Sequence, residues 1–168
     1  GPFLMEMVIA AGFFMLCVAI CVSAFVRADH LSRVGQDVNH GVLAAESLVE
    51  RVKAGNTEDF GTYEPDEAFG TVFENWRTKD PEASAVYQSI KDGGEVRNYQ
   101  ILWDKEWNSY PDTKELEKNG KKLAYVGMIT TGVKDQMKEI AVVIFGYGTY
   151  GDQGYKIYHL FAEQYVKP

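Results

Sequence analysis

Apolar side chains dominate the first part of the chain. Twenty residues from Met7 to Val26 carry no charged side chain, and the apolar ones fall on every side of a helix. This length matches the roughly 20 residues that a helix needs to cross the hydrocarbon core of a membrane. The pattern therefore predicts that residues 1–26 form the membrane-spanning part of a helix.

Two other interpretations of this apolar run compete with a membrane anchor. A buried helix of a soluble core would rarely be so long in a small domain. A secretory signal peptide would have a basic segment before a shorter apolar region. No Lys or Arg precedes the run, although Val22-Ser23-Ala24 has the small residues of a cleavage site. A membrane anchor fits the length and composition best.

After Arg27 the apolar residues form a single stripe with spacings of three and four residues, as on one face of a helix. The stripe comprises Leu31, Val34, Val38, Val42, Ala45, Val49 and Val52. No proline interrupts this part of the chain, and Gly55-Asn56 supplies a stop signal. We expect one continuous helix whose amphipathic second half, residues 27–54, packs on the rest of the chain.

Residues 55–168 are enough for one modest globular head. A helical pattern covers residues 66–79, with a further turn over residues 83–90. Alternation with a period of two then predicts an antiparallel sheet within residues 98–166. Its four expected strands are Tyr99–Trp107, Lys121–Val133, Lys138–Tyr147 and Tyr155–Val166.

The third expected strand has a continuous apolar core, Ile140 to Phe145, which favours an interior position in the sheet. The short connection Lys134–Met137 predicts a hairpin before it. The predicted fold class is therefore α+β, with a long N-terminal helix packed on a roughly four-stranded antiparallel sheet.

Charge and cysteine content narrow the classes of partner. The formal net charge is −7, which disfavours a nucleic-acid-binding surface because such surfaces need a basic patch. Both cysteines, Cys17 and Cys21, lie in the apolar run on one helix face, where membrane-buried thiols are a simpler interpretation than palmitoylation sites. The head has no cysteine, so we expect packing alone to hold it together.

Candidate catalytic and metal-binding chemistry is thin. The G-x-G-x-x-G pattern of residues 146–151 follows a strand, but another strand pattern comes next, which favours a turn over a dinucleotide site. The three histidines lack metal-ligand spacing. A cluster of acidic residues after the long helix is better explained as a solvated loop than as a Ca²⁺ site. These residues are His30, His40 and His159, and Glu58, Asp59, Glu64, Asp66 and Glu67. We predict no enzymatic activity, no metal and no cofactor.

Glu6 stands at the head of the apolar run. A carboxylate left unpaired in hydrocarbon costs several kcal/mol or becomes protonated. A free N-terminal ammonium group of a neighbouring subunit could pair with it and set the stagger between helices. The alternative is a hydrated carboxylate at the membrane interface.

The first six residues, GPFLME, resemble the prepilin processing motif of type IV pilins and type II secretion pseudopilins. In that motif a glycine precedes the cleaved bond and a glutamate stands fifth in the mature chain. Cleavage after Gly1 leaves Pro2 first and Glu6 fifth. The expected order of a long helix and then an antiparallel sheet is also that of pilins. The Phe3-Leu4-x-Glu6 start and the Asp-x-x-Trp sequence at 104–107 further resemble pilin-like proteins of Gram-positive anaerobes.

Two features depart from the family pattern. Proline is unusual as the first mature residue, and the C-terminal disulfide common in Gram-negative pilins is absent. Gly-Pro is also the remnant of some protease sites, in which case Phe3 would lead the native segment and Glu6 would be fourth. A short Lys/Arg-rich leader ending at Gly1 would support the pilin resemblance.

The resemblance implies a structural subunit, major or minor, of a type IV pilus-like or type II secretion-like filament. Prepilin peptidase would cleave after Gly1, Pro2 would be N-methylated, and Phe3 and Glu6 would contribute to subunit assembly. The implied partners are copies of itself, other pilin-like subunits, the pilus or secretion assembly platform and membrane lipid.

The resemblance also implies a location. The chain would first be a single-pass protein of the cytoplasmic (inner) membrane with an extracytoplasmic C-terminal domain, and then part of an extracellular filament. The alternative, from another class, is a monomeric membrane-anchored protein whose extracytoplasmic domain binds a ligand or another protein.

Overall fold

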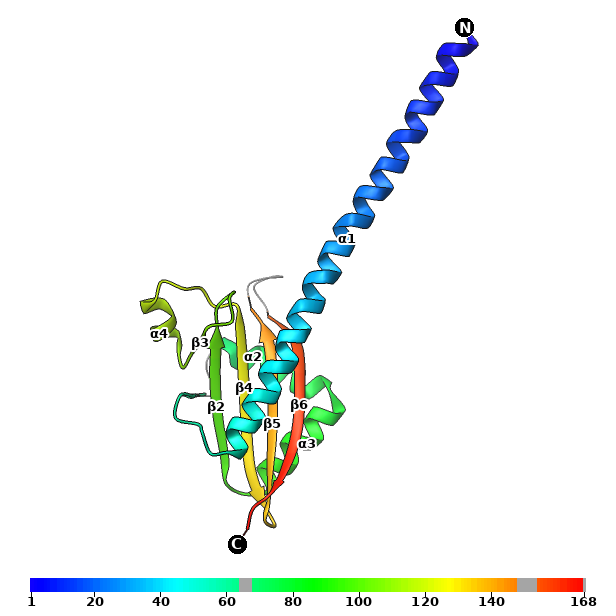
Figure 1. Cartoon of the computed structure of the whole chain (residues 1–168). Coiled ribbons are helices and arrows are strands. Elements are labelled where there is room, and N and C mark those ends of the chain that lie inside the picture. Colours follow the sequence, from blue (N-terminus) through cyan, green and yellow to red (C-terminus); the bar gives the residue numbers. More distant parts are fainter. Residues whose placement is uncertain (64–67, 148–153, 168) are drawn as a thin grey trace. The chain divides into compact units, whose positions relative to one another are not determined.

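The long N-terminal helix is continuous. The computed structural model describes residues 1–63, 68–147 and 154–167. Helix α1 runs over Pro2–Lys53, a length of 52 residues, which confirms the single helix expected from the sequence (Figure 1). The chain divides into two compact units, Gly1–Asn39 and His40–Pro168, so α1 contributes its first part to one unit and its last part to the other.

The second unit is built on an antiparallel sheet. Within the described residues, the sheet has six strands in the order β1-β2-β4-β5-β6, with β3 paired to the end of β2. The strands are β1 (Gly61–Thr62), β2 (Val96–Trp103), β3 (Ser109–Tyr110), β4 (Tyr125–Lys134), β5 (Met137–Gly146) and β6 (Tyr155–Tyr165). The α+β class is confirmed, but the expected number of strands was too low, because β1 and β3 have two residues each and are too short to show an alternating pattern.

The strands β4 and β5 form the predicted hairpin. Lys134 pairs with Met137, and the two turn residues, Asp135 and Gln136, have φ angles of +48° and +65°. Positive φ at both central residues matches the right-handed twist of the flanking strands. The strand β5 lies between β4 and β6, and its residues from Ile140 to Phe145 are at most 3% exposed, as expected for an interior strand.

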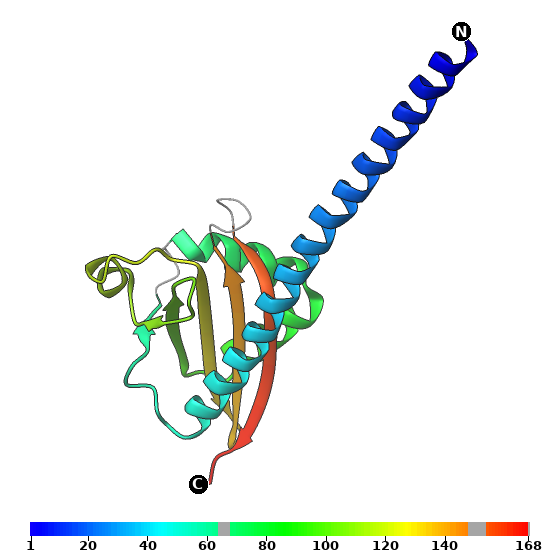
Figure 2. The same cartoon turned by 45° about the horizontal axis from the view of Figure 1, so that its top comes forward.

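Helices cover both faces of this sheet. The last part of α1 packs on one face, where Ala45, Leu48, Val49 and Val52 form a core with Ile129, Ile140, Val142, Ile144 and other sheet residues. The helices α2 (Ala68–Lys79) and α3 (Pro81–Asp92) cover the other face, and the short α4 (Thr113–Lys118) adds Leu116 to that second core. Figure 2 shows the sheet between these two layers. Alternate residues of β4 and β5 therefore enter different cores.

The helices of the head differ from the sequence-based expectation in extent. The expected extra turn over residues 83–90 is a full helix of 12 residues, α3. Asp80 caps it by accepting hydrogen bonds from the backbone N–H groups of Glu82 and Ala83, and Pro81 occupies the first helical position. Pro81 thus begins a helix here. The helix expected over 66–79 is α2, and residues 66 and 67 lie outside the described residues.

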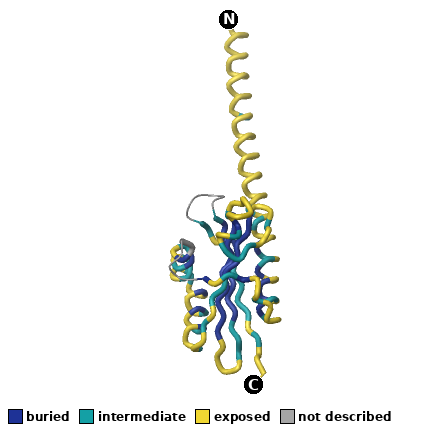
Figure 3. Tube along the Cα trace, turned by 90° about the vertical axis from the view of Figure 1, so that its left-hand side faces the viewer, coloured by how far each residue is buried: buried dark blue, intermediate teal, exposed yellow. Residues whose placement is uncertain are grey.

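Only part of the predicted apolar stripe of α1 is buried. Ala45, Val49 and Val52 are at most 3% exposed, whereas Leu31 is 69% and Val38 is 37% exposed. Figure 3 shows this change from exposed to buried residues along the chain. From Ala45 onward the stripe packs on the sheet of the head, as expected.

Candidate functional site

The residues expected to support processing and assembly all lie at the start of α1. Gly1 precedes the helix, Pro2 is its first residue, and Phe3 and Glu6 follow in the first two turns. All four are exposed, Phe3 by 71%. Proline suits the first position of a helix because the N–H that it lacks would have no partner within the helix. Phe3 and Glu6 are therefore available for contact with another molecule or with lipid.

The apolar run that follows meets the length and composition of a membrane span. Its most apolar stretch of 18 residues has a mean hydropathy of 2.6, and none of that stretch is buried inside the protein. A helix bonds its own backbone N–H and C=O groups, so it can enter hydrocarbon without unsatisfied polar groups. Cys17 and Cys21 are both free thiols within this run. By length and composition, this part of α1 is able to anchor the chain in a membrane.

The last part of α1 is attached closely to the sheet. A Cβ atom added at Gly41 would lie 2.8 Å from Ile157 Cγ2, so glycine permits the helix to approach β6 at this point. At the other end, the Lys138 ammonium donates to the Val52 carbonyl at 3.0 Å, and the Gln164 amide donates to the Lys53 carbonyl at 3.4 Å. These donors satisfy carbonyl groups that the end of a helix leaves without intrahelical partners.

A loop after β2 supports the same part of α1. Trp107 was expected on a strand, but it lies in this loop with a φ of +62°. Its indole ring stacks on Tyr125 with 4.0 Å between ring centroids and on His40 of α1 with 5.4 Å. The loop therefore brings an aromatic side chain between the sheet and the helix.

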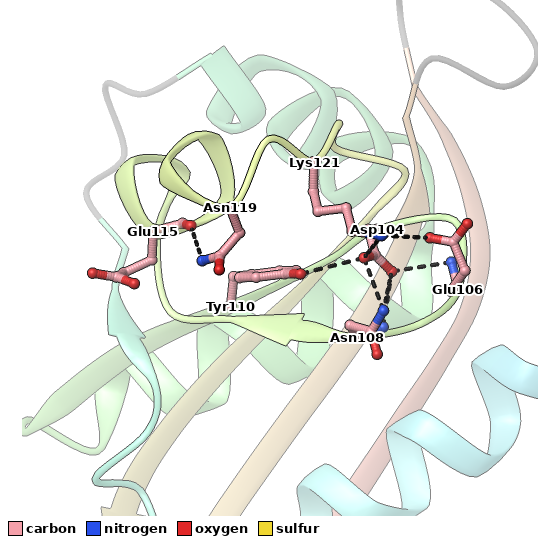
Figure 4. Close-up of polar contacts among 7 residues, drawn as sticks. All are labelled: Asp104, Glu106, Asn108, Tyr110, Glu115, Asn119 and Lys121. Carbon is pink, nitrogen blue, oxygen red and sulfur yellow. Dashed lines mark hydrogen bonds and ion pairs between the residues drawn. The ribbon is translucent and has the colours of Figure 1, made fainter.

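Asp104 holds this loop in its conformation (Figure 4). Its carboxylate is 1% exposed and accepts hydrogen bonds from the backbone N–H groups of Glu106 at 3.0 Å and Asn108 at 2.9 Å. The Asn108 side-chain amide donates at 2.9 Å, the Tyr110 hydroxyl donates at 3.3 Å, and the Lys121 ammonium lies 3.7 Å away. Both carboxylate oxygens thus have donors, as a buried charge requires.

Electrostatics around Asp104 favour its charged form. Burial by itself raises the pKa of this carboxyl, but the hydrogen bonds from Asn108 and from the Glu106 backbone, with the charge of Lys121, lower the pKa below its ordinary value. The carboxylates of Glu106 and Asp104 in turn raise the pKa of Lys121. Burial and then the Asp104 charge raise the pKa of Tyr110. The cluster is a charged, hydrogen-bonded support for the loop.

The other candidate motifs do not assemble into a reactive site in the part of the chain that the structure describes. His40 stacks on Trp107, and His159 lies against Trp76 with 5.4 Å between ring centroids. No three metal-ligating side chains come together among residues 1–63, 68–147 and 154–167. Asp59 of the acidic loop pairs with Arg51 at 3.1 Å.

Some of these motifs fall partly outside the described residues. Glu64, Asp66 and Glu67 of the acidic loop do so, as do residues 148–151 of the G-x-G-x-x-G pattern. That pattern begins at Gly146, the last residue of β5, and β6 starts at Tyr155. The next described element is therefore a strand, whereas a dinucleotide-binding motif leads into a helix.

Sequence reasoning missed the buried role of Asp104. The signal was an aspartate followed four residues later by an asparagine at the end of a strand, a pairing typical of side chains that bond to nearby backbone in turns. It also missed a pocket at the end of α1, because the pocket is lined by residues from four strands. Comparison with protein-family models, with curated proteins and with solved structures found no match to this chain.

Proposed function

We propose that this chain is a structural subunit of a type IV pilus-like or type II secretion-like filament, assembled through α1. One observation carries the proposal. A membrane-length apolar helix has a single carboxylate, Glu6, at its N-terminal end and continues without a break into a helix packed on an antiparallel sheet. An ionisable residue beside a membrane span suggests a functional contact.

The proposed assembly uses the exposed first part of α1. While the subunit is stored in the cytoplasmic membrane, the apolar surface of α1 contacts lipid and the globular head lies outside the cytoplasm. In the filament the same surface contacts the helices of other subunits, so apolar area stays away from water in both states. Cleavage after Gly1 by prepilin peptidase frees the amino group of Pro2, which is then methylated.

In this proposal Glu6 sets the axial stagger between the α1 helices of neighbouring subunits. Apolar helix surfaces slide past each other with little change in energy, whereas a buried carboxylate favours the one stagger that brings a cation to it. The cation is the N-terminal ammonium group of a neighbouring subunit, and Phe3 packs beside this pair.

The proposal is tested with Glu6→Ala. We expect the variant to insert into the membrane as the wild type does but to yield far fewer filaments, because the pairing that sets the stagger is lost. Insertion is measured as carbonate-resistant membrane protein, and assembly as sheared filaments. Asp29→Ala is a matched control, since Asp29 is an exposed acid of the same helix that pairs with Arg33 at 3.0 Å. Recovery of wild-type filament in Glu6→Ala would contradict the proposed role.

The second candidate is a monomeric membrane-anchored protein whose extracytoplasmic head binds a ligand, and the pocket at the end of α1 favours it. Mass spectrometry of the mature N-terminus discriminates the two. A chain that begins at Pro2, free or methylated, supports the filament subunit. A chain that keeps its upstream residues in cells with an active prepilin peptidase supports the monomeric receptor.

A further inference from the structure

A pocket of about 460 Å³ lies on the head at the C-terminal end of α1. The sheet continues beyond this end of the helix, as Figure 1 shows. Strands β2, β4, β5 and β6 all contribute lining residues, and Val52 and Lys53 of α1 form one wall. The volume is within the usual range of small-molecule sites, about 300–1,000 Å³.

The charge of this pocket is opposite to that of the whole chain. Four cationic side chains, those of Lys53, Arg97, Lys138 and Lys167, line it together with one carboxylate, Glu95, an excess of three formal positive charges. The chain as a whole has a formal net charge of −7. A concave site lined by one sign of charge concentrates ligands of the other sign, so this pocket attracts anions.

Two of the cations are already paired. Arg97 contacts Glu95 at 2.7 Å, and Lys53 contacts Glu50 at 3.1 Å. By contrast, none of the ion pairs found among the described residues involves Lys138 or Lys167. Lys138 donates one hydrogen bond to the Val52 carbonyl, and an ammonium group has three N–H donors. Lys138 and Lys167 therefore keep the capacity to bind an anion.

The rest of the lining is suited to an organic group. Tyr99 is partly buried, and Val133 and Val166 are 43% and 38% exposed. The Thr131 side chain adds a hydroxyl group to the lining. Ligand sites commonly combine apolar walls with a few polar groups that fix orientation. The pocket thus has a cationic part and an apolar part.

We propose that this pocket binds a small phosphate monoester. The phosphate group, which carries close to two negative charges at neutral pH, is held by Lys138 and Lys167. The organic part lies against Tyr99 and Val133. This binding site is additional to the proposed structural role of the subunit and does not depend on it.

The experiment is a calorimetric titration of the full-length chain in a polyoxyethylene detergent at low salt, with glucose 6-phosphate as the probe. We expect Lys167→Gln and Lys138→Gln each to lower the affinity about tenfold, as loss of a charged hydrogen bond does. The control is Lys114→Gln, which removes the same charge from an exposed site on α4 and should leave the affinity unchanged. Because Lys138 also bonds to α1, the exposed Lys167 supplies the decisive variant if Lys138→Gln unfolds.

Two further probes test the two parts of the site. Glucose should not bind, and inorganic phosphate should bind more weakly than glucose 6-phosphate because it cannot use the apolar wall. The proposal is overturned if glucose 6-phosphate does not bind, or if it binds no more tightly than inorganic phosphate. It is also overturned if Lys114→Gln weakens binding as much as Lys167→Gln. Filament yield from Lys167→Gln is a separate measurement, so failure of the pocket leaves the filament proposal standing.

Discussion

The two parts of α1 share one backbone conformation and differ in what surrounds their side chains. In Pro2–Asn39, every residue is exposed except Cys17, Val34 and Asp37, which are partly buried. In the next 14 residues, to Lys53, five residues are buried: Gly41, Ala45, Leu48, Val49 and Val52. The first part is apolar all round over Met7–Val26, while the last part is apolar on one face.

The two parts of α1 differ in how their apolar side chains can be removed from water. Burying one large aliphatic side chain stabilises a protein by about 1.5–3 kcal/mol, wherever the water-free environment comes from. The last part of α1 obtains that environment from its own sheet, with small residues at the closest approach. The first part carries large exposed side chains such as Phe13 and Phe14 on all sides, and it is long and apolar enough to cross a membrane.

The largest expected effect comes from placing a charge in the first part. Leu16→Lys puts a cation near the centre of the apolar run, where a lysine costs about 3 kcal/mol in membrane insertion. We expect the inserted fraction to fall in an assay that scores insertion of the first helix. Leu43→Lys is the control, because Leu43 is similarly exposed, by 64% against 59% for Leu16, but lies beyond the apolar run. Equal insertion of both variants would remove the distinction between the two parts.

A smaller effect is expected where the head supports the last part of α1. Asp104→Asn should lower the free energy of unfolding by about 2 kcal/mol, because donors that now face a buried carboxylate would face an amide. Chemical denaturation measures this change. Asp135→Asn is the control, since Asp135 is exposed in the hairpin turn and asparagine tolerates its positive φ. A loss as large in the control would show that Asp104 has no special role.

The Asp104→Asn variant should also change how the free energy of unfolding depends on pH. The pKa of Asp104 is lower in the folded protein than its ordinary value, about 3.9 in an unfolded chain. Its stabilising contribution is therefore complete above that ordinary value and is lost as the pH falls through the lower pKa of the folded state. We expect the unfolding free energy of Asp104→Asn to depend less on pH in this acidic window than that of the wild type.

The smallest expected effects come from replacing two glycines of α1, and the two replacements should change stability in opposite directions. Gly41→Ala should destabilise the head by about 1 kcal/mol, because strain against Ile157 outweighs the gain in helix propensity. Gly35→Ala has open space around its Cβ position and should stabilise the local helix by up to about 1 kcal/mol. Thermal unfolding measures the first, and amide hydrogen exchange along α1 measures the second. Stabilisation of the head by Gly41→Ala would mean that the contact with β6 is loose.

Much of the fold could be predicted because its signals are local. The continuous helix, the hairpin at Asp135 and Gln136 and the interior position of β5 each depend on a few adjacent residues. The strands β1 and β3 escaped prediction because two residues carry no periodicity. Trp107 was misplaced because its turn depends on hydrogen bonds to Asp104 and on stacking with Tyr125 and His40.

The candidate sites divide in the same way. Phe3 and Glu6 are conspicuous in the sequence, since a carboxylate at the head of an apolar run is unusual wherever it occurs. The pocket at the end of α1 was not predictable, because its lining residues, such as Lys138 of β5 and Lys167 after β6, are distant in sequence and are brought to one pocket only by the pairing of the strands. Cross-strand neighbours are set by register, and register depends on the whole sheet.

The sequence by itself determined the length of α1, the uncharged surface of its first part and the α+β class of the chain. These properties follow from composition and periodicity within single segments. Only the tertiary structure decided that the apolar stripe is buried from Ala45 onward, and that Asp104 is a buried support of the Trp107 loop. Burial and pairing are properties of contacts between distant segments, and the local pattern specifies an apolar face without specifying what covers it.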